Sequence, residues 1–199
     1  FLEKNDIPVL TGVDTRAITR RIRSYGTLQG VLVPADTPDE EVEKLLATPE
    51  EHDQVAQVTT KKVYTMGPED AQYSVAVLDY GVKRHILECL VEKGCRLTVF
   101  PAETPAEDVL AIDPDGIFLS NGPGDPADLK PEIENIKKMI GKKPIFGICM
   151  GHQVMALANG ARTKKMLFGH RGINQPVRDL VDHKICITSQ NHGFMVDED

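Results

Sequence analysis

Residues 146–153, Phe-Gly-Ile-Cys-Met-Gly-His-Gln, carry the strongest chemical signal in the sequence. Cys149 stands between Gly147 and Gly151, where an apolar stretch meets a helix-like one. Flanking glycines permit a sharp strand-to-helix turn that presents a nucleophile at its apex. The partial positive charge of a helix N-terminus favours the thiolate, and the next backbone N–H, that of Met150, points to where an oxyanion would form. The pattern therefore predicts a nucleophilic Cys149, against the alternative of a buried structural cysteine in a glycine-rich turn.

A second glycine-rich segment covers residues 118–126 and reads Phe-Leu-Ser-Asn-Gly-Pro-Gly-Asp-Pro. It also follows an apolar stretch, and taken alone it could be an ordinary surface turn. Together with the cysteine segment, it resembles the class I glutamine amidotransferases. In that family this turn lies beside the nucleophile and lends a backbone N–H to the oxyanion hole, a position that Gly124 holds here.

Other segments narrow the resemblance to one branch of this family, the glutamine-hydrolysing small subunits of carbamoyl-phosphate synthetases. The similar segments are residues 12–19, 26–30, 78–87, 165–172 and 189–194. Anthranilate and GMP synthetases share the cysteine turn but lack the N-terminal part. The resemblance thus covers nearly the whole sequence.

The resemblance implies a set of site residues. Cys149 is expected to be the nucleophile, with the backbone N–H groups of Met150 and Gly124 as oxyanion donors. The residues expected to contact glutamine are Gly122, Gly124, Met150, Gln153, Asn191, Gly193 and Phe194.

The activity implied is hydrolysis of L-glutamine through a γ-glutamyl thioester on Cys149. The ammonia would pass to a large synthetase subunit, which uses ATP, a divalent metal and bicarbonate to make carbamoyl phosphate for pyrimidine and arginine synthesis. No cofactor and no metal are expected in this chain, which has no Gly-x-x-x-x-Gly-Lys-Ser/Thr phosphate loop.

A thiol nucleophile needs a base and a group that orients the base. In the family these are a His and a Glu within a Gly-His-Pro-x-Glu segment. The sequence contains no His-Pro pair and ends at Asp199, so both residues are expected beyond it and the 199 residues alone are expected to be inactive. His192 is the alternative base, whereas His152 is expected to pack structurally. Two other functions stay open: a non-catalytic amidotransferase-like scaffold, and another thiol hydrolase of the same fold.

Short apolar stretches alternate with helix-like ones from residue 73 onward. The expected strands are 74–78, 96–100, 116–119 and 144–148, and the expected helices are 82–93, 106–111, 129–140 and 150–158. This alternation predicts a doubly wound α/β domain with a mostly parallel sheet, which would place both glycine-rich turns at the carboxyl ends of strands. Beyond Gly160 only strand-like pieces are expected, at 177–180 and 184–188.

Residues 1–64 are expected to form part of a smaller α/β N-terminal domain. Strands are predicted at 8–10 and 30–34, a helix between Asp14 and Gly26, and a second helix opened by a capping box at 37–40. Residues 65–72 have the composition of a linker. Residues 73–199 would then be the amidotransferase domain, incomplete at its C-terminal end.

The composition excludes several classes of protein. A net charge of −7 argues against a nucleic-acid-binding surface, and no run of 18 apolar residues is present to span a membrane. Four scattered cysteines without metal-ligand spacing fit a reducing, cytoplasmic compartment. Cys89, Cys95 and Cys186 fall in or near expected elements and are predicted to be more buried than Cys149.

Overall fold

The computed structural model describes residues 1–49 and 51–197, which divide into two compact units. The first unit comprises Phe1–Pro49 together with Leu167–Gly169. The second unit comprises the other described residues, 51–166 and 170–197. Each unit is described by itself below.

The first unit contains the short 3-10 helix η1 (Glu3–Asn5) and the helices α1 (Thr15–Tyr25) and α2 (Asp39–Leu46). As predicted, the Asp14 side chain caps α1 by accepting a hydrogen bond from the Ala17 N–H, and Gly26 follows its last turn. The capping box was wrong, because Pro38 occupies the cap position of α2 and no side chain caps that helix. The strands predicted at 8–10 and 30–34 are also wrong: within residues 1–49 the backbone pairs with no strand, and apolar side chains there, such as Val9 and Leu32, remain exposed.

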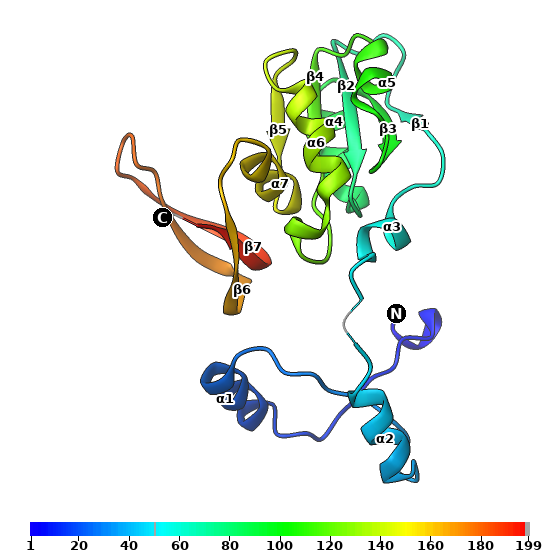
Figure 1. The fold of residues 1–199 in the computed structure, drawn as a ribbon, viewed down its shortest axis with the longest axis vertical. Helices are drawn as coiled ribbons and strands as arrows, with labels where there is room; N and C mark the ends of the chain where they lie inside the picture. Colours follow the sequence, from blue (N-terminus) through cyan, green and yellow to red (C-terminus); the bar gives the residue numbers. More distant parts are fainter. Residues whose placement is uncertain (50, 198–199) are drawn as a thin grey trace. The chain divides into compact units, whose positions relative to one another are not determined.

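The second unit is built on a five-stranded sheet (Figure 1). Its strands, in the order β1-β3-β2-β4-β5, are β1 (Tyr64–Met66), β3 (Cys95–Pro101), β2 (Tyr73–Asp79), β4 (Gly116–Leu119) and β5 (Ile145–Gly147). All neighbours pair in parallel except β1, which is antiparallel to β3. The predicted mostly parallel α/β sheet is therefore confirmed.

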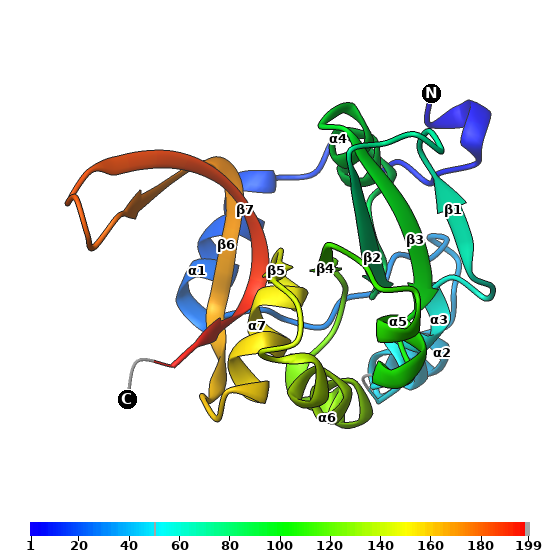
Figure 2. The same cartoon turned by 90° about the horizontal axis from the view of Figure 1, so that it is seen from above.

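Helices cover both faces of this sheet, as Figure 2 shows. The second unit's helical segments are α3 (Gln54–Val58), α4 (Arg84–Glu92), α5 (Ala106–Ala111), η2 (Pro126–Asp128), α6 (Lys130–Met139) and α7 (Met150–Ala158). Leu87 of α4 packs with Val77 and Leu97 in a cluster on one face of the sheet. Ile136 of α6 and Val154 of α7 belong to the larger cluster on the other face.

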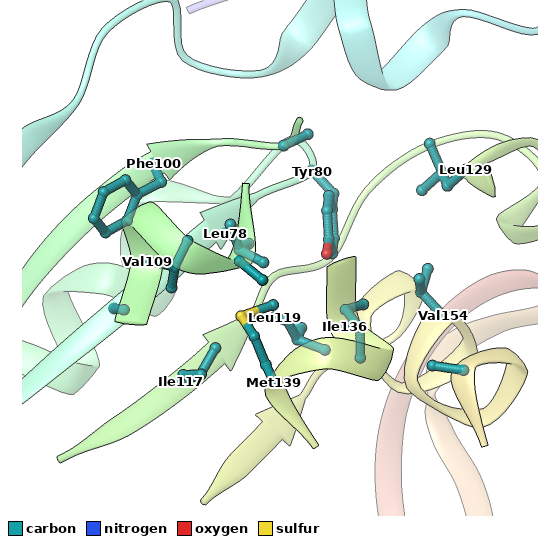
Figure 3. Packing of buried hydrophobic residues seen from close by; sticks show 14 of the residues in the cluster. Leu78, Tyr80, Phe100, Val109, Ile117, Leu119, Leu129, Ile136, Met139 and Val154 are labelled. Atoms are coloured by element: carbon teal, nitrogen blue, oxygen red, sulfur yellow. The ribbon is translucent and has the colours of Figure 1, made fainter. Parts of the chain in front are cut away.

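The larger cluster has the alternation that a pleated strand imposes. Ala76 and Leu78 of β2 face it, whereas Val77 between them faces the smaller cluster. Figure 3 shows Leu78 and Leu119 of the sheet packed close to Ile136 and Met139 of α6. This two-sided burial fixes β2 and β4, and β4 leads into the second glycine-rich turn.

The second unit begins earlier than the sequence indicated. Residues up to 64 were assigned to the N-terminal domain and 65–72 to a linker, but β1 pairs with β3 from Tyr64 to Met66. Val55 of α3 is buried in the larger cluster. The reason is that α3 is too short for its periodicity to stand out, and β1 acquires its structure only from a remote partner strand.

A long antiparallel hairpin follows α7, and all of it except Leu167–Gly169 belongs to the second unit. It consists of β6 (Thr163–Arg178) and β7 (Ile185–Val196), much longer than the predicted pieces at 177–180 and 184–188. The register shifts twice, between Lys165 and His170 and again between Gly172 and Gln175. Between the shifts lie three paired positions, which include the pairs His170–His192 and Arg171–Asn191.

Candidate active site

Cys149 stands at the turn between β5 and α7. Its backbone has φ 53°, a left-handed conformation that costs a non-glycine residue on the order of 1–3 kcal/mol. The strain is held by glycines on either side. A Cβ on Gly147 would lie 2.5 Å from the carbonyl carbon of Gly151, and one on Gly151 would overlap the carbonyl oxygen of Leu119. The turn predicted from the sequence is present, and backbone packs directly on backbone around it.

Two hydrogen bonds tie this turn to the neighbouring strand. The Gly151 N–H lies 2.9 Å from the Ser120 carbonyl oxygen and 3.0 Å from that of Ile148. The Ile148 N–H donates to the Leu119 carbonyl at 3.0 Å. The cysteine turn and the segment that follows β4 therefore form one backbone assembly.

The second glycine-rich turn is fixed against the loop after β2. A Cβ on Gly122 would overlap the carbonyl oxygen of Tyr80. The Ser120 hydroxyl accepts the Tyr80 N–H at 2.9 Å, and the Asn121 amide donates to the Gly81 carbonyl at 3.0 Å. Sequence analysis missed the roles of Ser120 and Asn121, although both lie within the segment that it singled out.

A cavity of about 820 Å³ opens at these turns, entirely within the second unit. Five of the predicted site residues line it: Gly122, Cys149, Gln153, Asn191 and Phe194. Met150, Gly124 and Gly193 are not among its lining residues. The Met150 side chain is buried in the core, and the Met150 backbone N–H lies close enough to Cys149 to lower the pKa of its thiol.

The hairpin reaches the cysteine turn through two contacts. The Gln153 amide donates to the Phe194 carbonyl at 2.6 Å, and the Cys149 thiol donates to the Asn191 carbonyl at 3.7 Å. The structure therefore brings the Asn191–Phe194 stretch of β7 against the nucleophile. Sequence spacing alone could not show this, because about 40 residues separate the partners.

Arg171 is a further residue of the site that the sequence analysis missed. Its Nη1 donates to the Asn191 side-chain oxygen at 2.6 Å, and its Nη2 lies 3.4 Å from the place a Cβ on Gly193 would take. The arginine therefore orients the Asn191 amide and packs beside Gly193. The signal that could have revealed it is the cross-strand pairing of Arg171 with Asn191, which needs the hairpin register.

Burial raises the pKa of the Cys149 thiol above its usual range. The Met150 N–H and the positive charges of Lys83 and Arg171 act in the opposite direction, but burial prevails. The helix N-terminus was expected to favour the thiolate. Its first N–H does lower the pKa of Cys149, but by less than burial raises it. In this structure the thiol form is favoured, and its S–H has an acceptor in the Asn191 carbonyl.

The histidines near the thiol are His152 and His192, which both line the cavity. His192 directs Nδ1 to the Phe194 carbonyl at 2.7 Å, while its Nε2 lies 2.9 Å from the Gln190 side-chain oxygen and 3.2 Å from His170 Nδ1. Both ring nitrogens thus have partners other than Cys149. This geometry favours a role for His192 in holding β7 rather than in accepting the thiol proton.

Of the other three cysteines, only Cys95 is more buried than Cys149, as predicted. Cys95 is buried, but Cys89 and Cys186 are exposed, because Cys89 lies on the outer face of α4 and Cys186 in the outer part of β7. Within residues 1–49 and 51–197, no group of three or more His, Cys, Asp or Glu side chains could hold a metal ion. None of the helices described is long and apolar enough to cross a membrane.

Comparison with known proteins places this site in context. Residues 76–199 match the family described as glutamine amidotransferase class-I. The chain is 46% identical over 196 residues to the carbamoyl phosphate synthase small chain of Clostridium perfringens, covering 98% of this chain and 56% of that protein. It is 49% identical over 200 residues to the carbamoyl phosphate synthase pyrimidine-specific small chain of Halalkalibacterium halodurans, covering 100% and 54%. The chain thus spans about half the length of the curated relatives it matches.

The fold is also found among solved structures. A Thermoplasma acidophilum protein assigned to GMP synthase superposes with a TM-score of 0.54 at 23% identity, covering 63% of this chain and 67% of that one. At this identity the likeness concerns the fold alone.

Proposed function

Because the chain belongs to the class I glutamine amidotransferase family, we propose that it comes from the glutamine-hydrolysing small chain of a carbamoyl-phosphate synthase. The observation that carries the proposal is the position of Cys149. Its sulfur lies at a strained strand-to-helix turn and opens into a cavity shared with Gln153, Asn191 and Phe194. The description of the matched family supplies glutamine as the substrate, and the names of the similar small chains supply the synthesis of carbamoyl phosphate, in one of them for pyrimidines.

In the proposed reaction, the Cys149 thiolate attacks the side-chain amide carbon of glutamine. The tetrahedral oxyanion would be stabilised by the backbone N–H groups of Met150 and Gly124, since donors preorganised toward a developing charge lower the barrier most. The nitrogen takes up a proton as the C–N bond breaks, so that ammonia departs and a γ-glutamyl thioester remains. Water then attacks the thioester carbonyl and releases glutamate and the thiol.

The rest of the cavity would bind and orient the substrate. Gln153 and Phe194, already hydrogen-bonded to each other, form one wall beside the thiol. Asn191 lines the cavity from β7, next to Gly193, and Gly122 lines it from the opposite turn, where the absent side chain lets the turn pack against Tyr80. Polar groups placed around a concave surface in this way fix orientation more than they add affinity.

The pKa of Cys149 adds a requirement to this mechanism. A thiol whose pKa is raised by burial needs a base to ionise near neutral pH. We assign this role to a His held by a Glu, as the family resemblance implies, and not to His192, whose ring nitrogens bind Phe194, Gln190 and His170.

We further propose that the ammonia passes to a large synthase chain. That partner would bind ATP and a divalent metal and form carbamoyl phosphate for pyrimidine and arginine synthesis. The small chain would form a heterodimer with it in the cytoplasm, where four unpaired cysteines are compatible with a reducing environment.

The two alternatives, a non-catalytic scaffold and another thiol hydrolase, are less well supported. A scaffold would not need a strained Cys149 in the cavity, and a general hydrolase would not account for 46–49% identity that extends through the first 75 residues.

Glutamate release by the full-length protein, with and without its large partner, tests the proposal. Activity should disappear in Cys149→Ser, while synthesis of carbamoyl phosphate from free ammonia should persist. Unchanged glutamate release in Cys149→Ser would contradict the proposed nucleophile. Failure of the protein to associate with a large ATP-binding chain would contradict the proposed partner.

A further inference from the structure

Residues 52–60, termed the buttress segment here, lie ahead of the residues that match the family. They contain α3 and belong to the second unit. The segment contacts three of the loops that follow parallel strands, at the sheet edge where the cavity opens. It is therefore placed to act on the site although the family match does not include it.

Two hydrogen bonds and one buried side chain anchor the buttress segment. The Thr60 N–H donates to the Asp79 carboxylate at 2.8 Å at the end of β2. The Thr59 hydroxyl accepts the Ala102 N–H at 3.0 Å after β3. Val55 is only 4% exposed and belongs to the larger core cluster. The segment is thus fixed from its own side, independently of the glycine-rich turns.

Its remaining contacts are with the turn that carries Gly124. The Gln54 side-chain oxygen lies 2.8 Å from the position of a Cβ on Gly124, where φ is +88°. Val58 and Pro123 fill the corresponding position beside Gly81. His52 Nδ1 lies 2.8 Å from the Asp128 carboxylate, just after the same turn. Gln54 therefore occupies the space that the absent glycine side chain leaves open.

We propose that Gln54 is a positioning residue for the oxyanion turn, and that the buttress segment makes glutamine hydrolysis depend on residues outside the amidotransferase match. The inference rests on the proposed function, in which the Gly124 N–H is an oxyanion donor. A glycine with positive φ has a wide range of backbone conformations, so its N–H direction must be fixed by its neighbours. Gln54 restricts that range from one side, and the Tyr80–Gly122 approach restricts the same turn at its other end.

The test uses the full-length protein bound to its large partner. Gln54→Ala should lower kcat for glutamate release by about tenfold with little change in KM, since a misdirected oxyanion donor weakens binding of the transition state only. Gln54→Glu should lower kcat further, because a carboxylate of the same shape would repel the oxyanion. A purely structural role predicts the reverse order, with the near-isosteric Glu milder than Ala.

Gln57→Ala is the matched control. Gln57 lies on the same helix, is exposed, and hydrogen-bonds only Glu51 and Asp53 among the described side chains, so this variant should keep the wild-type kcat. Thermal midpoints of all variants separate loss of fold from loss of positioning. If the wild-type protein releases glutamate and both Gln54 variants do so at the wild-type rate, the inference is overturned and the proposed function stands. No glutamate release from the wild-type protein would overturn both.

Discussion

The two sides of the candidate site are held in place by different kinds of contact. On the side of the two glycine-rich turns, backbone meets backbone: Gly151 against Leu119, and Gly122 against Tyr80. On the side of the β6–β7 hairpin, side chains make the contacts, as Arg171 does with Asn191 and Gln153 with Phe194. The first side leaves no room for an added methyl group, whereas the second depends on particular polar groups.

This difference predicts how each side responds to substitution. Steric overlap with backbone has no inexpensive relief, because a close-packed interior relaxes only in part. A side-chain hydrogen bond at a partly exposed site is replaced in part by water, so its loss costs less. Substitutions in the turns should therefore cause an abrupt loss of activity, whereas substitutions in the hairpin should lower activity gradually.

The largest effect is expected from Gly151→Ala. The added Cβ would overlap the Leu119 carbonyl oxygen, so the cysteine turn must move away from β4. Displacement of a reacting group by about 1 Å costs on the order of a hundredfold in rate, and glutamate release should fall by at least that much. Gly116→Ala is the control, since its Cβ would make an ordinary contact 3.6 Å from the Pro144 carbonyl. Equal activity in the two variants would contradict the steric account.

Gly124→Val should have the next largest effect. A β-branched residue at φ +88° is strained, and it would meet the Gln54 side chain. Removing one oxyanion donor costs about a hundredfold or more in kcat, with synthesis from free ammonia preserved. Gly141→Val imposes the same kind of strain at φ +78° with no atom within 4 Å, so it separates backbone strain from damage to the site. A comparable drop in glutamate release by the Gly141 variant would assign the effect to strain alone.

Arg171→Gln tests the hairpin side. Loss of the guanidinium leaves the Asn191 amide free to rotate, so KM for glutamine should rise about tenfold, equivalent to about 1.4 kcal/mol, with a smaller change in kcat. Arg178→Gln on the same strand should leave KM unchanged. An abrupt loss of activity in Arg171→Gln, as large as that of Gly151→Ala, would remove the distinction between the two sides.

The same distinction explains what the sequence could predict. The cysteine turn, β4 and α7 were predictable because their signals are local: an apolar run, a glycine that sterics require, and a helix that starts at Met150 and ends before Gly160. Such requirements are written in adjacent residues, so no knowledge of the tertiary fold is needed to recognise them.

The parts that were missed depend on partners distant in the sequence. The hairpin is long because β6 and β7 pair across register shifts, and Arg171 becomes a site residue only through that pairing. Residues 51–66 appeared to be domain end and linker because their anchors lie at Asp79, Ala102 and the strand β3. The raised pKa of Cys149 reflects burial, which a local helix-dipole argument does not include.

The smallest effect is expected from the charges around the thiol. Because burial raises the pKa of Cys149, its alkylation by iodoacetamide should be slow at pH 7 and should accelerate as the pH rises beyond the usual thiol range, where the thiolate forms.

Lys83 lowers the pKa of Cys149, so Lys83→Gln should move the pH profile of alkylation to still higher pH. It should slow the reaction at pH 7 by about two- to fivefold, as expected for one partly screened charge. Lys93→Gln, at the far end of α4 and not among the charges acting on the thiol, should leave the profile unchanged. Peptide mapping is needed because Cys89 and Cys186 are exposed and compete for the reagent. A shift to lower pH in Lys83→Gln would have the wrong sign for the loss of a cation, and would mean that the side chain acts on the thiol through packing rather than through charge.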